Sequence, residues 1–198
     1  MKLRNKNLKI LKSNHVYSEE MEHDACGVGL VVSTEGLKSR KVVEYGIDAL
    51  KAVWHRGAID ADGKTGDGAG IHIEIPKDFF EEKIEVTGHK HDNSELCVGM
   101  IFLPRNDYSA QEQCRTIVES ELTKRNFSIY GWRQVPVDPS VLGDKAEQTR
   151  PEITQVLFTY NDKKVVNKSL EQKLYETRRV IEREALNNQL NNFYICSF

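Results

Sequence analysis

The sequence predicts an α+β domain in which sheets and helices form separate layers. Segments with the two-residue period of a strand alternate along the chain with segments that have the 3.6-residue period of a helix. The chain has 198 residues, which is enough for one well-packed domain. No glycine-rich phosphate-binding loop follows the first expected strand, because residues 66–70 carry glycines at a different spacing and precede a strand rather than a helix.

The first half of the expected domain contains two strands and one helix. Residues 26–32 form a short apolar run with two glycines, which is typical of a buried strand. Residues 39–54 place apolar side chains on one helical face. A loop rich in glycine and aspartate follows at 60–70, and residues 71–75 then alternate apolar and polar until Pro76 ends the strand.

The second half continues this alternation. In order, we expect a short helix around residues 79–80, a surface loop at 85–95, a strand at 96–103, a helix after it, strands at 127–137 and 153–160, a helix at 167–188 and the beginning of a strand at 193–196. Ser109 and Glu112 have the spacing of a capping box, which predicts that the middle helix begins at Ser109. The apolar face of that helix would comprise Ala110, Cys114, Ile117, Val118 and Leu122.

The composition is that of a soluble globular protein. Hydrophobic residues make up 39% of the chain, charged residues 29%, and the net charge is −2. This balance gives no electrostatic reason to expect nucleic acid or an anionic membrane as a partner. No apolar run approaches the roughly 18 to 20 residues of a membrane-spanning helix.

The N-terminal segment, residues 1–25, is polar and shows no sustained period, so we expect it to be a leader before a domain at 26–198. It lacks the apolar core and the cleavage site of a secretory signal. An organelle transit peptide is the alternative, although the basic residues here are mainly Lys rather than Arg. We favour a cytoplasmic chain with a short removable leader.

The four cysteines are widely spaced and form no C-x-x-C pair, which indicates neither a disulfide scaffold nor a zinc site. We expect Cys97 and Cys114 to be buried small hydrophobic residues, because both lie in apolar segments. Cys26 differs, because it stands between the leader and the first strand. Gly27 and Gly29 follow it and let a substrate approach the backbone closely.

Three segments occur in a characteristic order: Asp24-Ala25-Cys26-Gly27-Val28-Gly29, His55-Arg56-Gly57-Ala58 and Thr65-Gly66-Asp67-Gly68-Ala69-Gly70. Together they resemble the N-terminal class II glutamine amidotransferase domain of glutamate synthases. Residues 193–197 are similar as well. The resemblance implies a layered αββα sandwich of the N-terminal-nucleophile hydrolase type, incomplete in this chain, with Cys26 exposed by removal of the leader.

The resemblance makes Cys26 the nucleophile that attacks the side-chain amide of glutamine. An ordinary thiol, with a pKa of about 8.5, is mostly protonated at neutral pH. A free α-amine, with a pKa of about 7.7 to 8.0, can take the thiol proton directly or through a water. In the leader-bearing chain this nitrogen is an amide without basicity, so we expect leader removal to activate the site.

By the same resemblance, Arg56 and Gly57 lie beside the nucleophile, and Asp67 and Gly68 help to shape the substrate site. An alternative for Arg56 is a cation at a helix C-terminus that holds the following loop. Asp67 is expected to fix its own loop through backbone hydrogen bonds rather than to act in catalysis.

The histidines are expected to have other uses. His55 is favoured as a structural residue, because the family needs no catalytic base at that position. His89 and His91 suggest a metal site, but they fall in an expected surface loop without further ligands, so we expect no metal there.

The resemblance implies no cofactor in this segment and, for a full-length parent, FMN and a 3Fe-4S cluster. It implies glutamine, the rest of the large subunit and a small NADPH-oxidising subunit as partners. The oxyanion-hole and glutamine-gripping residues of the family lie beyond Phe198, so we expect the chain alone to be a poor glutaminase. The alternatives are another class II amidotransferase, which residues 66–70 disfavour, and a non-catalytic truncated fragment.

Overall fold

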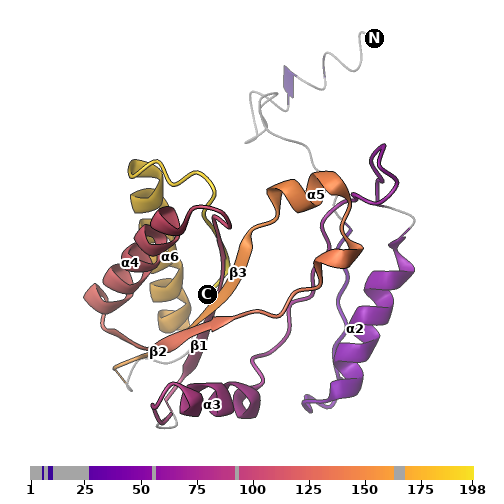
Figure 1. Ribbon diagram of the computed structural model, residues 1–198. Coiled ribbons are helices and arrows are strands. Elements are labelled where there is room, and N and C mark those ends of the chain that lie inside the picture. The colour runs from indigo at the N-terminus through magenta and orange to yellow at the C-terminus, as the bar shows by residue number, and fades with distance from the viewer. Residues whose placement is uncertain (1–5, 7–8, 11–26, 55–56, 92–93, 163–167) are drawn as a thin grey trace. The chain divides into compact units, whose positions relative to one another are not determined.

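The computed structural model describes residues 6, 9–10, 27–54, 57–91, 94–162 and 168–198. The chain divides into two compact units. The smaller unit comprises Met1–Gly57 and Ala69–Ile71, and the larger one comprises Ala58–Gly68 and His72–Phe198. The sheet and most of the helices belong to the larger unit (Figure 1).

The larger unit is built on a four-stranded sheet in which every neighbouring pair is antiparallel. Its strands are β1 (Leu96–Leu103), β2 (Phe127–Gln134), β3 (Glu152–Tyr160) and β4 (Tyr194–Ser197), in the order β2-β3-β1-β4. All four were predicted. The prediction for β2 was too long, because the strand ends before Pro136, which lacks the N–H that a ladder needs.

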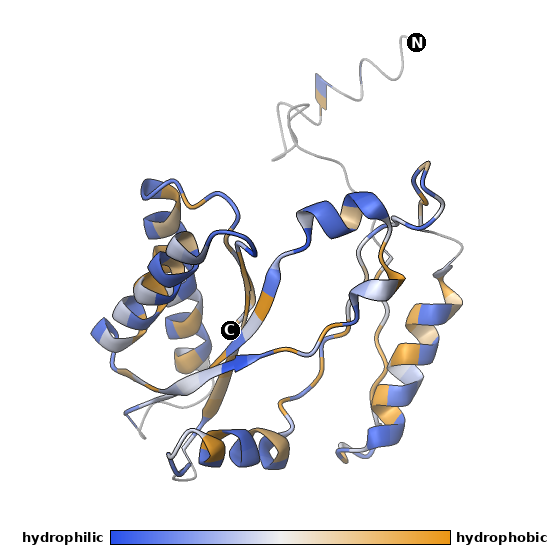
Figure 2. Cartoon of the chain, in the orientation of Figure 1, coloured by the Kyte–Doolittle hydropathy of each residue, from blue (hydrophilic) through white to orange (hydrophobic). Residues whose placement is uncertain are grey.

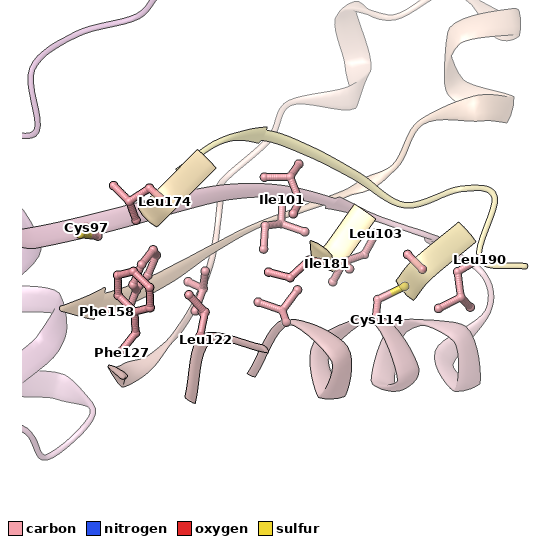
Figure 3. Packing of buried hydrophobic residues seen from close by; sticks show 14 of the residues in the cluster. Cys97, Ile101, Leu103, Cys114, Leu122, Phe127, Phe158, Leu174, Ile181 and Leu190 are labelled. Carbon is pink, nitrogen blue, oxygen red and sulfur yellow. The ribbon is translucent and has the colours of Figure 1, made fainter. Parts of the chain in front are cut away.

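One face of the sheet carries the main hydrophobic core, beneath α4 (Tyr108–Lys124) and α6 (Lys168–Asn187) (Figure 1). Alternation along β1 directs Cys97, Ile101 and Leu103 to this face. Figure 3 shows these side chains against residues of both helices. The fully or nearly buried members of the core include Cys114, Val118 and Leu122 of α4, Leu170, Leu174, Ile181 and Ala185 of α6, and Phe127, Val156 and Phe158 of the sheet. The apolar face predicted for α4 is therefore confirmed, and α6, predicted as a helix, buries one face as well.

The opposite face of the sheet packs against α3 (Lys77–Val86), the helix predicted around residues 79–80. Phe80 and Ile84 of α3 are buried against Leu96, Tyr130 and Leu157. The sheet therefore has a helix on each face, and the predicted α+β class is confirmed.

The N-terminus of α4 differs from the predicted capping box. The N-cap is Asp107, whose carboxylate accepts a hydrogen bond from the Ala110 amide at 2.9 Å. Ser109 consequently lies inside the first turn rather than at its start. The prediction was wrong because aspartate and serine both favour the N-cap, so the sequence pattern does not distinguish Asp107 from Ser109.

Two short elements between β2 and β3 were not predicted. They are the 3-10 helix η2 (Pro139–Val141) and α5 (Asp144–Thr149). A six-residue helix is too short to display a 3.6-residue period, which explains the omission.

The smaller unit contains α2 (Arg40–Ala52), as predicted from residues 39–54. Ser39 is its N-cap and accepts a hydrogen bond from the Lys41 amide at 3.2 Å. None of its residues is buried, although apolar and hydrophilic residues are interleaved along it (Figure 2).

The strands predicted at residues 26–32 and 71–75 are not formed within the described part of the chain. Residues 27–32 and 71–75 belong to no helix and pair in no ladder, and residue 26 lies outside the described residues. Their apolar side chains are partly or largely exposed. An alternating pattern favours an extended backbone, but a strand also needs a hydrogen-bonded neighbour, which the pattern does not supply.

No helix among the described residues is long and apolar enough to cross a bilayer.

Candidate active site

The predicted site residues fall into two groups. Cys26 and Arg56, together with His55, lie outside the described residues. Gly57, Asp67 and Gly68 are described. The described part of the candidate site is therefore the polar loop between Gly57 and Gly68.

Residues 58–67 form a narrow two-stranded ribbon. Ile59 and Gly66 form an antiparallel bridge, and the Asp67 amide donates to the carbonyl oxygen of Ala58 at 3.3 Å. Nearer the tip, the Asp60 amide donates to the carbonyl oxygen of Thr65 at 2.7 Å. The ribbon therefore brings Ala58, the last residue of the first motif, against Gly66 and Asp67 of the second.

Asp67 closes the base of this ribbon. Its Oδ2 accepts a hydrogen bond from the Ala58 amide at 2.9 Å, while its own amide bonds back to the same residue. Ala58 directly follows Gly57 in the sequence. The contact is of the kind that the sequence predicts for Asp67, a carboxylate that holds loop backbone.

The tip of the ribbon is a turn organised by Asp62. Its Oδ1 accepts from the amides of Lys64 and Thr65 at 2.9 and 2.7 Å, and its Oδ2 accepts from the Thr65 hydroxyl at 2.5 Å. Gly63 supplies the positive φ of 70° that the turn requires. The Thr65 hydroxyl, followed by the two amides, lowers the pKa of Asp62 to about 2, so the carboxylate is charged at neutral pH.

The two site glycines, Gly57 and Gly68, and their neighbour Gly66 have different surroundings. The Gly57 amide donates to the carbonyl oxygen of Trp54 at 3.0 Å, and a Cβ at Gly57 would lie 3.3 Å from that oxygen. A Cβ at Gly66 would be similarly close to the carbonyl oxygen of Ala58, at 3.2 Å. A Cβ at Gly68 would meet nothing within 4 Å, so packing alone does not require a glycine there.

Two of the other cysteines, Cys97 and Cys114, are poorly suited to act as nucleophiles. Cys97 and Cys114 are buried in the main core, as predicted. Burial raises the pKa of the Cys97 thiol to about 12 and that of Cys114 to about 11. Both thiols therefore stay protonated at neutral pH, whereas Cys196 is exposed on β4.

His89 and His91 lie beside Tyr130 rather than around a common centre. The His91 ring is almost fully buried, with its Nδ1 3.0 Å from Oε1 of Glu81. Nδ1 of His89 is 3.1 Å from the Thr87 hydroxyl. In the described part of the chain, no three side chains of histidine, cysteine, aspartate or glutamate are grouped so as to hold a metal ion.

Four residues that contact the ribbon or form its tip were not singled out from the sequence. Asp60 and Asp62 belong to a loop that was recognised as rich in aspartate, and Asp62-Gly63 is a familiar turn pair. Gly143 and Lys145 contact the same turn from a distant segment. No sequence pattern indicates that approach, because it depends on the tertiary fold.

The motif segments and the α+β fold together define a class of protein. The family model described as "Glutamine amidotransferases class-II" matches residues 26–198. The chain belongs to this family, and its fold class is that of the N-terminal-nucleophile hydrolases. The predicted family of this domain is therefore confirmed.

Within that family, the chain is similar to glutamate synthases. It is 51% identical over 191 residues to the glutamate synthase [NADPH] large chain of Azospirillum brasilense, covering 96% of this chain and 12% of that protein. It is 35% identical to the ferredoxin-dependent glutamate synthase of Pyropia yezoensis, with the same two coverages. Identity to the glutamate synthase [NADH] of Saccharomyces cerevisiae is 34%, over 92% of this chain and 9% of that protein. The chain thus spans a small part of the length of these relatives.

Proposed function

We propose that this domain is a glutaminase whose nucleophile is Cys26, made N-terminal by removal of residues 1–25. The observation that carries the proposal is the family match, which begins at residue 26 rather than at the start of the chain. The similarity to glutamate synthases over nearly the whole chain supports glutamine as the substrate.

The reaction follows from thiol and amine chemistry. The free α-amine of Cys26 takes the thiol proton, and the thiolate Sγ attacks the side-chain amide carbon of glutamine. The tetrahedral intermediate collapses as the protonated amine returns its proton to the leaving nitrogen, which gives a γ-glutamyl thioester and ammonia. Water then attacks the thioester, releasing glutamate and restoring the thiol.

The remaining site residues are assigned supporting roles. We assign Arg56 and Gly57 to positions beside the nucleophile, where they orient its amine. Asp67 and Gly68 shape the substrate site, and the hydrogen bonds between Asp67 and Ala58 support this assignment because they tie the second motif to the residue after Gly57.

In a full-length glutamate synthase, the ammonia would pass to 2-oxoglutarate. The names of the relatives support this parent activity but differ in the electron donor, which is NADPH, ferredoxin or NADH. FMN and a 3Fe-4S cluster would belong to other parts of such a parent. The described residues offer no group of ligands for the cluster, and no step of the glutaminase reaction needs either group.

The proposed partners follow from the same parent. They are glutamine, the rest of the large subunit and a small NADPH-oxidising subunit, of which the last is supported by the NADPH-dependent relative. The cytoplasm is the proposed compartment, because the basic segment at the start of the chain lacks the features of a secretory signal.

Intact-mass measurement of the full-length protein that carries this chain tests the proposal. We expect a mature species that begins at Cys26 and gains one label from a diazoketone analogue of glutamine. Cys26→Ser, with the leader removed by design, is the matched control and should not be labelled. Labelling at another cysteine, or glutaminase activity that survives Cys26→Ser, would refute the assignment.

A further inference from the structure

Gly143 lies directly against the tip of the 58–67 ribbon. Its backbone angles, φ −79° and ψ 163°, are extended and open to any residue. A Cβ at this position would nevertheless lie 2.6 Å from the Thr65 amide nitrogen and even closer to the side chains of Thr65 and Asp62. Close approach, rather than backbone conformation, therefore requires a glycine at position 143.

A charged contact joins the same two segments. Nζ of Lys145 lies 2.6 Å from Oδ2 of Asp60, whose amide bonds to Thr65 across the ribbon. Lys145 is largely exposed, so this ion pair contributes little to global stability. Its effect is local, because it fixes one strand of the ribbon beside α5.

The segment that carries these contacts is itself held by hydrogen bonds to the loop after β1. Glu147 accepts hydrogen bonds from the guanidinium groups of Arg105 and Arg150, and Arg105 also donates to the Glu147 carbonyl oxygen at 3.1 Å. The buried Gln111 side chain on α4 donates to the carbonyl oxygens of Pro104 and Arg105 at 2.7 and 3.2 Å. A continuous set of contacts thus runs from α4 through α5 to the ribbon.

We infer that residues 143–150, the anchoring segment, position the 58–67 ribbon for glutamine binding, with Gly143 as the principal positioning residue. The inference rests on the proposed function, in which Asp67 and Gly68 at the base of the ribbon shape the glutamine site. A shift at the tip changes the course of the whole ribbon, because backbone hydrogen bonds couple its two strands from Asp60–Thr65 to Ala58–Asp67.

Gly143→Ala tests the inference in the mature full-length protein that carries this chain. The added methyl must displace Thr65 and Asp62, and a displacement of about 1 Å near a reacting site can cost about a hundredfold in rate. We expect the glutamine KM to rise about tenfold or more, because a displaced ribbon would bind the substrate less well. Simple loss of folded protein would lower the apparent kcat and leave KM unchanged, so the KM separates positioning from stability.

Two further variants keep the test informative if Gly143→Ala folds poorly. Lys145→Ala changes an exposed side chain and should raise KM by a smaller factor, while Lys145→Arg keeps the positive charge and should restore the parent KM. Asp78→Ala, at an exposed position in the first turn of α3 and outside the anchoring segment, is the matched control and should leave KM unchanged.

Hydrogen exchange at the amides of Lys64 and Thr65, which both bond to Asp62, reports on the ribbon without requiring activity. Faster exchange in Gly143→Ala, together with the raised KM, is the expected result. Unchanged exchange would overturn the anchoring. Faster exchange with an unchanged KM would overturn the positioning role. If the mature parent protein has no glutaminase activity, the proposed function fails with that role, while exchange still decides the anchoring.

Discussion

The sheet of the larger unit and the extended segments at 27–32 and 71–75 have similar apolar sequences but very different surroundings. Ile101 and Phe158 in the sheet are 0% exposed, whereas Val28 and Leu30 are 95% and 87% exposed. The sheet strands each pair with at least one neighbour, and the extended segments pair with none among the described residues. Apolar alternation therefore predicts an extended backbone, while burial is decided by pairing and by the covering helices.

The largest expected effect in this comparison comes from truncating the core of the sheet. Phe158 packs on Phe127 and Phe198 with both ring centroids at 5.4 Å. Phe158→Ala should lower the free energy of unfolding by about 3–5 kcal/mol, measured by urea denaturation. Leu30→Ala is the matched change in an extended segment and should alter it by less than about 0.5 kcal/mol. Similar losses for both variants would show that the two regions are equally buried in solution.

Glycine substitutions sharpen the same contrast. A Cβ at Gly99 in β1 would lie 2.7 Å from Cγ1 of Val156 and 2.9 Å from Cε1 of Phe198. Gly99→Ala should therefore cost about 1–3 kcal/mol of unfolding free energy through overpacking. Gly29→Ala meets nothing within 4 Å and should change it by no more than about 0.5 kcal/mol. An unchanged free energy of unfolding in Gly99→Ala would mean that Val156 and Phe198 can move aside without cost.

Removing the helix caps of α4 and α2 should give a smaller difference in the free energy of unfolding between the two regions. Asp107→Ala removes the cap of α4, which covers the core, and should cost about 1 kcal/mol of unfolding free energy in thermal or urea denaturation. Ser39→Ala removes the cap of α2, which buries none of its residues, and should reduce helix content without moving the sheet transition. Ser109→Ala should have little effect; a loss as large as that of Asp107→Ala would favour the capping box instead.

The smallest effect is expected from surface charge, whose stabilising contribution is present at neutral pH and is lost in acid. Hydrogen bonds from Arg150 and then Arg105 lower the pKa of Glu147 from 4.5 to about 2. A depressed carboxyl pKa stabilises the folded state above the unfolded pKa, and this stabilisation is lost as the pH falls from about 4.5 toward 2. Glu147→Gln should therefore flatten the pH dependence of unfolding in that window. Glu44→Gln, which removes an exposed ion pair on α2, is the control, and an equal flattening there would contradict the prediction.

The sequence was sufficient to predict the elements whose periodic pattern extends over many residues and whose apolar face is buried. β1, β3, α4 and α6 belong to this group, because each repeats its pattern over eight or more residues against the core. It was insufficient for α5, which is too short to show a period, and for residues 27–32 and 71–75, whose pattern says nothing about a pairing partner.

For the site, the motif residues were found through their resemblance to a family, and their contacts were not. The hydrogen bonds between Ala58 and Asp67 depend on a ribbon that folds back over nine residues, which loop composition alone does not specify. Gly143 gives even less indication, because its backbone angles are ordinary and its neighbours Asp62 and Thr65 are far away in the sequence. Such close approaches become visible only when the tertiary fold is known.

The strand order has a consequence for how the chain folds as it is synthesised. Ile101 in β1 pairs with Thr154 of β3 and with Ile195 of β4, both of which emerge from the ribosome much later. The apolar β1 segment, LCVGMIFL, consequently waits without a ladder until β3 has been made. A nascent strand of this kind is a binding target for chaperones that shield apolar segments, and its ladder can first form when residues 152–160 of β3 have been made.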